Sequence, residues 1–280
     1  MIHELPLERR TLHGHFSRDL EPVLAIDPGD TVRGSNLAAG WAQFEGPRSP
    51  KLDSGHALVG PIEVRGARPG QTLAVRVEAL EPGPWGVTVA GDHEVRWELD
   101  GGIGRSDLFE LELRPFLGVI GMPPPEPGIH STTPPRLWGG NLDCKELVTG
   151  STLFLPIPVD GALLSFGDGH ALQGDGEVCG TAIECPMARA ELNVDVRSDL
   201  ELSTPIAHTP AGWVTLGLGA TLDEAAAQAT EAMLDLMERE QGLSRPDALA
   251  LASLVVDLRV TQVVNGTVGV HAVLAYPPPP

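Results

Sequence analysis

The chain has 280 residues, of which 20% are charged, and its formal net charge is −19 at pH 7. A chain this acidic is a poor partner for nucleic acid or for anionic membrane surfaces, so we expect neither as a partner. The length allows a sizeable core, and the 33 glycines and 26 prolines indicate many turns and few long helices.

The three cysteines, Cys144, Cys179 and Cys185, form neither an even disulfide framework nor a CxxC zinc pattern. They predict reduced thiols in a reducing compartment. The first 16 residues lack the apolar core of a signal peptide, and no apolar run approaches the roughly 20 residues that span a bilayer. We therefore expect a cytoplasmic protein with no membrane partner.

Short alternating segments separated by Pro-Gly turns fill the first part of the chain. Residues 11–34 predict two strands around Pro28-Gly29, and residues 62–77 repeat the pattern around Pro69-Gly70. His56 comes just before another strand. Loops beside rigid strands commonly carry function, so His56 is a candidate metal ligand or substrate contact, with a hydrogen-bonded turn histidine as the alternative.

A proline-rich segment, residues 118–138, leads into the centre of the chain. Such a segment must be extended and held by its surroundings, so we expect it to wall the site. His130 within it is a candidate pocket residue, and packing at the rim is the alternative.

The most informative stretch is residues 139–184, which gathers acids around its single imidazole, His170. Its acidic candidates are Asp143, Asp168, Asp175, Glu177 and Glu184. Glycines flank Asp168 and Asp175, and glycine permits positive φ and close approach of a ligand. On a strand, Asp168 and His170 point to the same face. A carboxylate and an imidazole on one face make half of a site for a divalent metal.

Local signals predict the remaining elements. Asp160-Gly161 between two apolar runs predicts a hairpin over residues 151–166. A capping box at Thr221 and an apolar stripe predict a helix over about 222–240, and Ser244 begins a second helix that reaches about 256. Strands over 258–264 and 267–274 follow, joined at Asn265-Gly266, and the proline tail 277–280 is expected to be extended.

The central stretch resembles the acetamidase/formamidase family. The matching segments are Gly139-Gly140-Asn141-Leu142-Asp143, Gly150 to Leu153, Gly167-Asp168-Gly169-His170, Gly174 to Glu177, and Cys179 to Glu184. Further matches at residues 15–18 and 55–61 extend the resemblance over most of the first 200 residues. It implies a mostly β fold, a bound metal, a homo-oligomer that we expect to be a dimer, and hydrolysis of formamide or acetamide to ammonia and a carboxylate.

Amide hydrolysis needs an activated nucleophile, a stabilised oxyanion and a proton donor for nitrogen, and a metal can supply the first two. We assign His56, Asp143 and His170 to a divalent metal, with zinc favoured over calcium, and Asp168 and Glu184 to proton transfer. The opposite partition, with Asp168 as ligand and Asp143 as base, stays open. Asn141, the Gly169 amide and His130 are the candidate substrate contacts.

Two alternatives remain. One is a thiol mechanism through Cys144 or Cys179, which a chelator would not inhibit. The other is a β-sandwich module that binds a small ligand or calcium and has no amidase activity. For the fold, we expect a mainly β protein in which residues 1–200 form jelly-roll, β-sandwich and barrel-like units and carry the catalytic segments. Residues 201–280 form a smaller α+β part.

Overall fold

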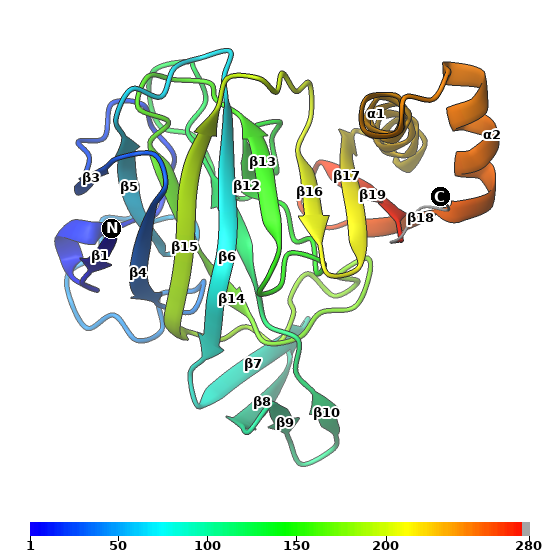
Figure 1. Cartoon of the computed structure of the whole chain (residues 1–280). Coiled ribbons are helices and arrows are strands. Elements are labelled where there is room, and N and C mark those ends of the chain that lie inside the picture. Colours follow the sequence, from blue (N-terminus) through cyan, green and yellow to red (C-terminus); the bar gives the residue numbers. More distant parts are fainter. Residues whose placement is uncertain (276–280) are drawn as a thin grey trace.

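Strands dominate the regular structure in the computed structural model, which describes residues 1–275 (Figure 1). The largest sheet has nine strands. In spatial order they are β1 (Ile2–Leu5), β4 (Asp30–Asn36), β15 (Met187–Arg197), β6 (Thr72–Pro82), β13 (Thr152–Pro156), β16 (Ile206–Thr209), β17 (Gly212–Gly219), β19 (Val268–Leu274) and β18 (Val256–Gln262).

A second sheet has six strands, and a third has four. The six-stranded sheet contains β12 (Gly139–Asn141), β11 (Phe116–Gly121), β14 (Leu164–His170), β5 (Leu58–Val64) and β2 (Leu12–His13), with β3 (Leu24–Ile26) pairing to β5. The four-stranded sheet contains β10 (Glu110–Glu112), β9 (Ile103–Arg105), β8 (His93–Asp100) and β7 (Trp85–Ala90). A short 3-10 helix spans Arg9–Thr11.

The six-stranded sheet packs against one face of the nine-stranded sheet. Side chains alternate along a strand, so Leu73, Val75 and Val77 of β6 point into a common core. Ile120 of β11 and Phe166 of β14 enter the same core from the facing sheet. All five side chains are almost fully buried. This is β-sandwich packing.

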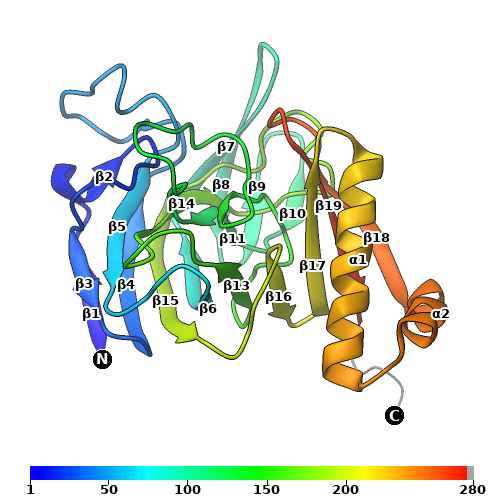
Figure 2. The ribbon, with the colours of Figure 1, turned by 90° about the horizontal axis from the view of Figure 1, so that it is seen from above.

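The opposite face of the nine-stranded sheet is covered near its C-terminal strands by α1 (Leu222–Gln241), as Figure 2 shows. Ala74 lies between Leu73 and Val75 on β6, so its side chain points to the opposite face of the sheet, where it joins the same apolar cluster as Met233 of α1. The helix begins at Thr221, whose hydroxyl accepts from the Glu224 amide at 3.2 Å, and it ends at Gly242 in the left-handed region. The second helix, α2, spans Arg245–Val255.

The predicted mainly β fold, with sandwich packing and two C-terminal helices, is confirmed. All three sheets of residues 1–275 are open, so no barrel closes among them. The nine-stranded sheet runs without interruption through β13 and β16, across the boundary expected near residue 200. No described helix has the length and hydropathy needed to cross a membrane. The proline tail lies outside the described residues.

The hairpin predicted over residues 151–166 is wrong. Its first strand, β13, pairs with β6 and β16 in the nine-stranded sheet, whereas its second, β14, pairs with β5 and β11 in the six-stranded sheet. The Asp160-Gly161 segment therefore connects the two layers of the sandwich. This connection sends β14 into the middle of the six-stranded sheet, where its last residues build the site.

Candidate active site

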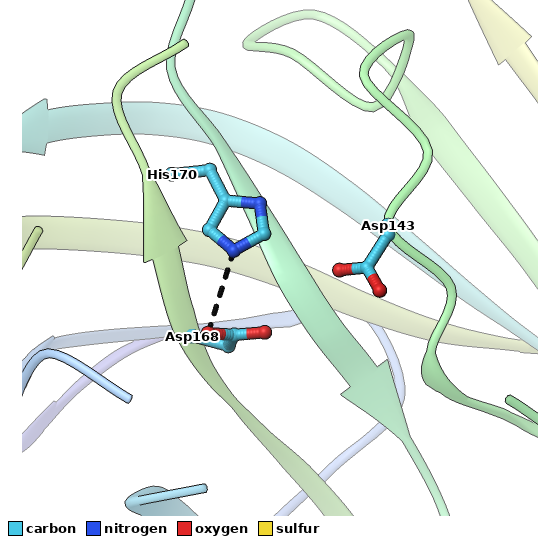
Figure 3. Close-up of side chains that lie close together, drawn as sticks. All are labelled: Asp143, Asp168 and His170. Atoms are coloured by element: carbon cyan, nitrogen blue, oxygen red, sulfur yellow. Dashed lines mark ion pairs between the residues drawn. The ribbon is translucent and has the colours of Figure 1, made fainter. Parts of the chain in front are cut away.

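The strand β14 delivers the central acid and the imidazole. Asp168 and His170 lie two residues apart at its end and point to the same side, as predicted (Figure 3). His170 Nε2 lies 3.4 Å from Asp168 Oδ1, and both side chains are almost completely buried. The sequence provides for this through Gly167 and Gly169: a Cβ at either position would lie 2.6 Å from a backbone oxygen of the adjoining chain.

Asp143 reaches the same space from the segment that follows β12. One donor atom each from Asp143, Asp168 and His170 lie within 4.8 Å of one another. The floor beneath them is Gly118 on β11, which pairs with both β12 and β14. A Cβ on Gly118 would lie 2.6 Å from Asp168 Oδ2 and 2.7 Å from Asp143 Oδ1, so glycine is what leaves room for the two carboxylates.

Two glutamates complete the group. Glu177 and Glu184 can each present an oxygen within 4.8 Å of a His170 ring nitrogen and of each other. Glu184 Oε1 lies 3.2 Å from His170 Nε2 and accepts from the Ala182 amide at 2.9 Å. We refer to Asp143, Asp168, Glu177 and Glu184, which surround His170, as the acid cluster.

The backbone is strained at three of these acids. Among the described residues, six non-glycine residues have positive φ, and they include Asp143 at 49°, Asp168 at 58° and Glu177 at 47°. A side chain in the left-handed region costs free energy, and such residues concentrate at functional sites. Packing elsewhere in the fold holds these three carboxylates in place.

Gln173 fixes the orientation and tautomer of His170. Its amide nitrogen donates to the Asp143 carbonyl at 2.9 Å, so its amide oxygen must face His170 Nδ1, also at 2.9 Å. An oxygen can only accept, and therefore Nδ1 carries the proton. Nε2 then points at the acid cluster, which is how ligand histidines are commonly held.

The C-terminal part of the chain also reaches the site. Asn265, in the turn between β18 and β19, donates from its side-chain amide to Asp143 Oδ2 at 2.6 Å. Two backbone hydrogen bonds of 3.2 Å tie this region to Gly176: Gly176 N–H donates to Thr261 O, and Val263 N–H donates to Gly176 O. The Asn265-Gly266 pair predicts the turn, but its local sequence does not assign Asn265 to the site.

Electrostatics in the cluster are dominated by burial and by like charges. Burial raises the pKa of Asp143 well above its usual range, and the neighbouring carboxylate of Glu177 raises it further. Burial also raises the pKa of Glu177, to about 7. Burial alone would raise the pKa of Asp168 as well, but His170 and His56 outweigh it and hold that pKa low.

The effects of burial and of the neighbouring carboxylates on the pKa of His170 have opposite signs. Burial alone would lower the pKa of His170, but Glu184 and Asp168 raise it well above its ordinary value. Four carboxylates thus surround His170, and His56 lies 4.0 Å from one of them. The acids outnumber the imidazoles, so a bound cation would balance the charge of the cluster.

The donor set fits a divalent metal ion. Asp143 Oδ1, Glu177 Oε2 and Glu184 Oε2 are buried and have no hydrogen-bond partner among the described residues. Buried polar atoms are normally satisfied, so unpaired carboxylate oxygens within one cluster of acids favour a cationic ligand nearby. Carboxylate oxygens with one imidazole nitrogen are donors that zinc accepts.

A pocket of about 300 Å³ opens beside the cluster. It brings together several predicted site residues, namely His56, Asn141, Asp168 and Glu184. Asn141 donates to the Thr133 carbonyl at 3.1 Å, and its buried Oδ1 has no partner among the described residues. His56 is held by Thr132 Oγ1 at 2.8 Å, and its Nε2 lies 4.0 Å from Asp168 Oδ2.

Two predicted substrate contacts lie elsewhere. His130 does not line the pocket; its backbone pairs with Phe16, and its Nε2 donates to the Glu126 carbonyl at 3.0 Å. Gly169 does not line the pocket either. A Cβ on Gly169 would point toward Cys185 and Met187.

All three cysteines are free thiols. Burial raises the pKa of Cys144 and of Cys185 to about 12, so neither supplies a thiolate near neutral pH. Cys179 is exposed and donates weakly to the Thr181 carbonyl at 3.4 Å.

Comparison with known proteins identifies the family. The sequence matches the model of the Acetamidase/Formamidase family over residues 3–101 and 128–277. The chain belongs to this family of amidohydrolases. The resemblance seen in the central stretch is thereby confirmed, and the match continues through β18 and β19 to residue 277.

Solved structures agree over the whole chain. A "predicted acetamidase/formamidase" from Thermoanaerobacter tengcongensis is 27% identical with a TM-score of 0.88, and the match covers 98% of this chain and 96% of that one. An acetamidase from Bacillus halodurans is 29% identical with a TM-score of 0.87 and coverage of 98% and 97%.

Among sequence relatives, an acetamidase from Mycolicibacterium smegmatis is 56% identical over 55 residues, which are 19% of this chain and 13% of that protein.

Proposed function

We propose that this protein is a metal-dependent hydrolase of small aliphatic amides such as formamide and acetamide, releasing ammonia and a carboxylate. The observation that carries the proposal is the convergence of Asp143, Asp168 and His170 above Gly118, beside a pocket of about 300 Å³. The names of the relatives, acetamidase and formamidase, support the choice of substrate.

We assign Asp143, Asp168 and His170 as the residues that would hold the ion. Their donor atoms lie together, whereas His56 lies at the edge of the group, 4.0 Å from Asp168. This assignment makes both Asp143 and Asp168 ligands, so it differs from either partition considered from the sequence. A site with an imidazole ligand suits zinc better than calcium, which favours six to eight oxygen ligands. When bound, the ion would acidify water and polarise the amide carbonyl.

The chain's own residues account for orientation and proton transfer. Asn141 Oδ1, unpaired at the pocket wall, can accept a hydrogen bond from the substrate –NH₂ group. Glu177 and Glu184 line the pocket and each has a buried oxygen without a partner, so they are placed to accept a proton from the attacking water. The same proton passes to the amide nitrogen as the C–N bond breaks, because ammonia leaves far more readily than an amide anion.

The remaining predictions concern His56, His130, the Gly169 amide, the oligomeric state and the location. His56 lies beside Asp168 and is positioned to hold that carboxylate or to contact substrate. We propose no substrate contact for His130 or the Gly169 amide, because neither residue lines the pocket. A homodimer and a cytoplasmic location remain our proposals, supported by the family resemblance and by the free cysteines.

The test is ammonia release from formamide and acetamide by the purified protein, before and after dialysis against a chelator. Activity should disappear on dialysis and return on addition of zinc. Asp143→Asn should contain less metal and lose activity by orders of magnitude, whereas His93→Gln, at the exposed first residue of β8, controls for surface histidines that bind metal. A chelator-resistant enzyme that is inactivated by a thiol reagent at Cys179 would replace this proposal with the thiol mechanism.

A further inference from the structure

Beside the acid cluster, the pocket has an extended apolar wall. Trp85, Val87 and Val89 all line it, and they share one face of β7 because they are spaced by two residues. The strand is attached directly to the site: Val87 N–H donates to the Glu184 carbonyl at 2.9 Å, and Glu184 N–H donates back at 2.8 Å. The apolar row therefore begins next to a residue assigned to proton transfer.

Three alanines, Ala38, Ala39 and Ala42, continue this wall from the loop after β4. The loop is anchored at Trp41, which is buried, has φ of 64° and donates from its indole nitrogen to the Gly55 carbonyl at 2.8 Å. The Ala57 amide donates to the Ala39 carbonyl at 3.0 Å. These contacts fix the alanines in place, so the wall is formed before any substrate binds.

The wall extends past the pocket. A second cavity of about 380 Å³ shares Ala42, Trp85 and Val87 with the first and is also lined by Glu94, Arg96 and Trp97 of β8. The two cavities are therefore adjacent at β7. A substrate with a longer chain can extend from the first cavity into the second without displacing the acid cluster.

Acetamide is too small for this space. It has four non-hydrogen atoms, and at roughly 30 Å³ for each water-sized group it occupies at most about 120 Å³. The first hollow alone is about 300 Å³. Most of the apolar wall would then face water or empty space, although burying it against a ligand is favourable.

We propose that this apolar wall binds the acyl chain of the substrate, and that the enzyme prefers unbranched primary amides of about four to six carbons over formamide and acetamide. The inference rests on the proposed amidase function and specifies its substrate class. The amide group sits at the acid cluster, and the methylene groups lie along Val87, Trp85 and Ala42. Each buried methylene should raise kcat/KM about fourfold, the factor equivalent to about 0.8 kcal/mol.

The experiment is a series of primary amides from formamide to hexanamide, with kcat/KM measured by ammonia release. We expect kcat/KM to rise from acetamide to at least butanamide. The variant Val87→Thr keeps the shape of the wall and adds a hydroxyl, so it should lower kcat/KM for pentanamide about tenfold more than for acetamide. Val95→Thr makes the same change on the opposite face of the adjacent strand β8 and should affect all amides equally.

The outcomes separate the two proposals. If kcat/KM falls steadily with chain length, or if Val87→Thr and Val95→Thr behave alike, the apolar wall does not bind the acyl chain and amide hydrolysis still stands. If no amide in the series yields ammonia, the proposed function itself fails.

Discussion

The substitution Gly118→Ala should separate the chemistry of the site from the stability of the fold. The new Cβ would lie 2.6 Å from Asp168 Oδ2, 2.7 Å from Asp143 Oδ1 and 2.9 Å from His170 Cε1, whereas ordinary contacts begin near 3.4 Å. Each carboxylate oxygen must therefore move by roughly 0.7 Å. Metal sites tolerate only about 0.2 Å in ligand distance, and a misplacement near 1 Å costs about 100-fold in rate.

The fold should survive this change. The atoms that would meet the Cβ belong to side chains and not to the backbone, and Gly118 is not among the glycines with positive φ. We expect a loss of no more than about 1–2 kcal/mol in the free energy of unfolding. Amide hydrolysis should fall at least 100-fold, and the content of bound zinc should fall with it.

Three measurements decide the outcome: ammonia release, metal content and unfolding in urea. The matched control is Gly104→Ala on β9, where the added Cβ would meet Leu113 Cδ2 at 3.0 Å, away from the pocket. The control should keep activity and metal. If Gly118→Ala retained both as well, the space above Gly118 would not be the reaction centre.

Two further predictions test the support of the site and its surroundings. Asn265→Ala should lower both zinc affinity and activity by about 10–100-fold, because Asp143 loses the donor that orients it; unchanged zinc affinity would mean that this contact is incidental. Burial lowers the pKa of His13 from 6.5 to about 4, so the buried imidazole is neutral at pH 7. The free energy that the neutral imidazole contributes to stability is fully present above pH 6.5, its pKa in the unfolded chain, and is lost as the pH falls toward 4. Relative to His13→Gln, wild type should lose about 2–3 kcal/mol of unfolding free energy between pH 7 and 4.5 in urea titrations, and parallel curves would refute this.

Local signals in the sequence predicted local structure well. The helix start at Thr221 and the stop at Gly242 are decided by hydrogen bonds within a few residues, and both were predicted correctly. The same holds for Asp168 and His170, whose shared face follows from strand alternation alone. The turn at Asn265-Gly266 also joins two paired strands as predicted.

Pairing between layers was not predictable in this way. Asp160-Gly161 has the chemistry of a hairpin turn, but turn chemistry does not specify which strands will pair. The strands on either side, β13 and β14, pair with strands from distant parts of the chain, β6 and β16 in one sheet and β5 and β11 in the other. The predicted hairpin failed for this reason.

The residues missed at the site share one property: their role depends on distant neighbours. Gly118 precedes Asp168 by fifty positions and matters only because β11 pairs with β14. Gln173 has no motif, and its function follows from two simultaneous hydrogen bonds, to His170 and to the Asp143 carbonyl. No spacing rule would have found either one.

The C-terminal strands are part of the active site in the same sense. Arg259 of β18 donates to the buried carboxylate of Glu146 at 3.0 Å, and Glu146 follows Asp143 by three residues. Asn265 then contacts Asp143 directly from the end of the same β hairpin. Glu146 also accepts from Arg114, so removal of β18 and the turn after it takes away one of the two charged partners of Glu146 and the amide that donates to Asp143. Changes in β18 should therefore be felt at Asp143. The α+β part therefore holds one wall of the reaction centre, and a truncation before β18 should abolish metal binding even if the sandwich still folds.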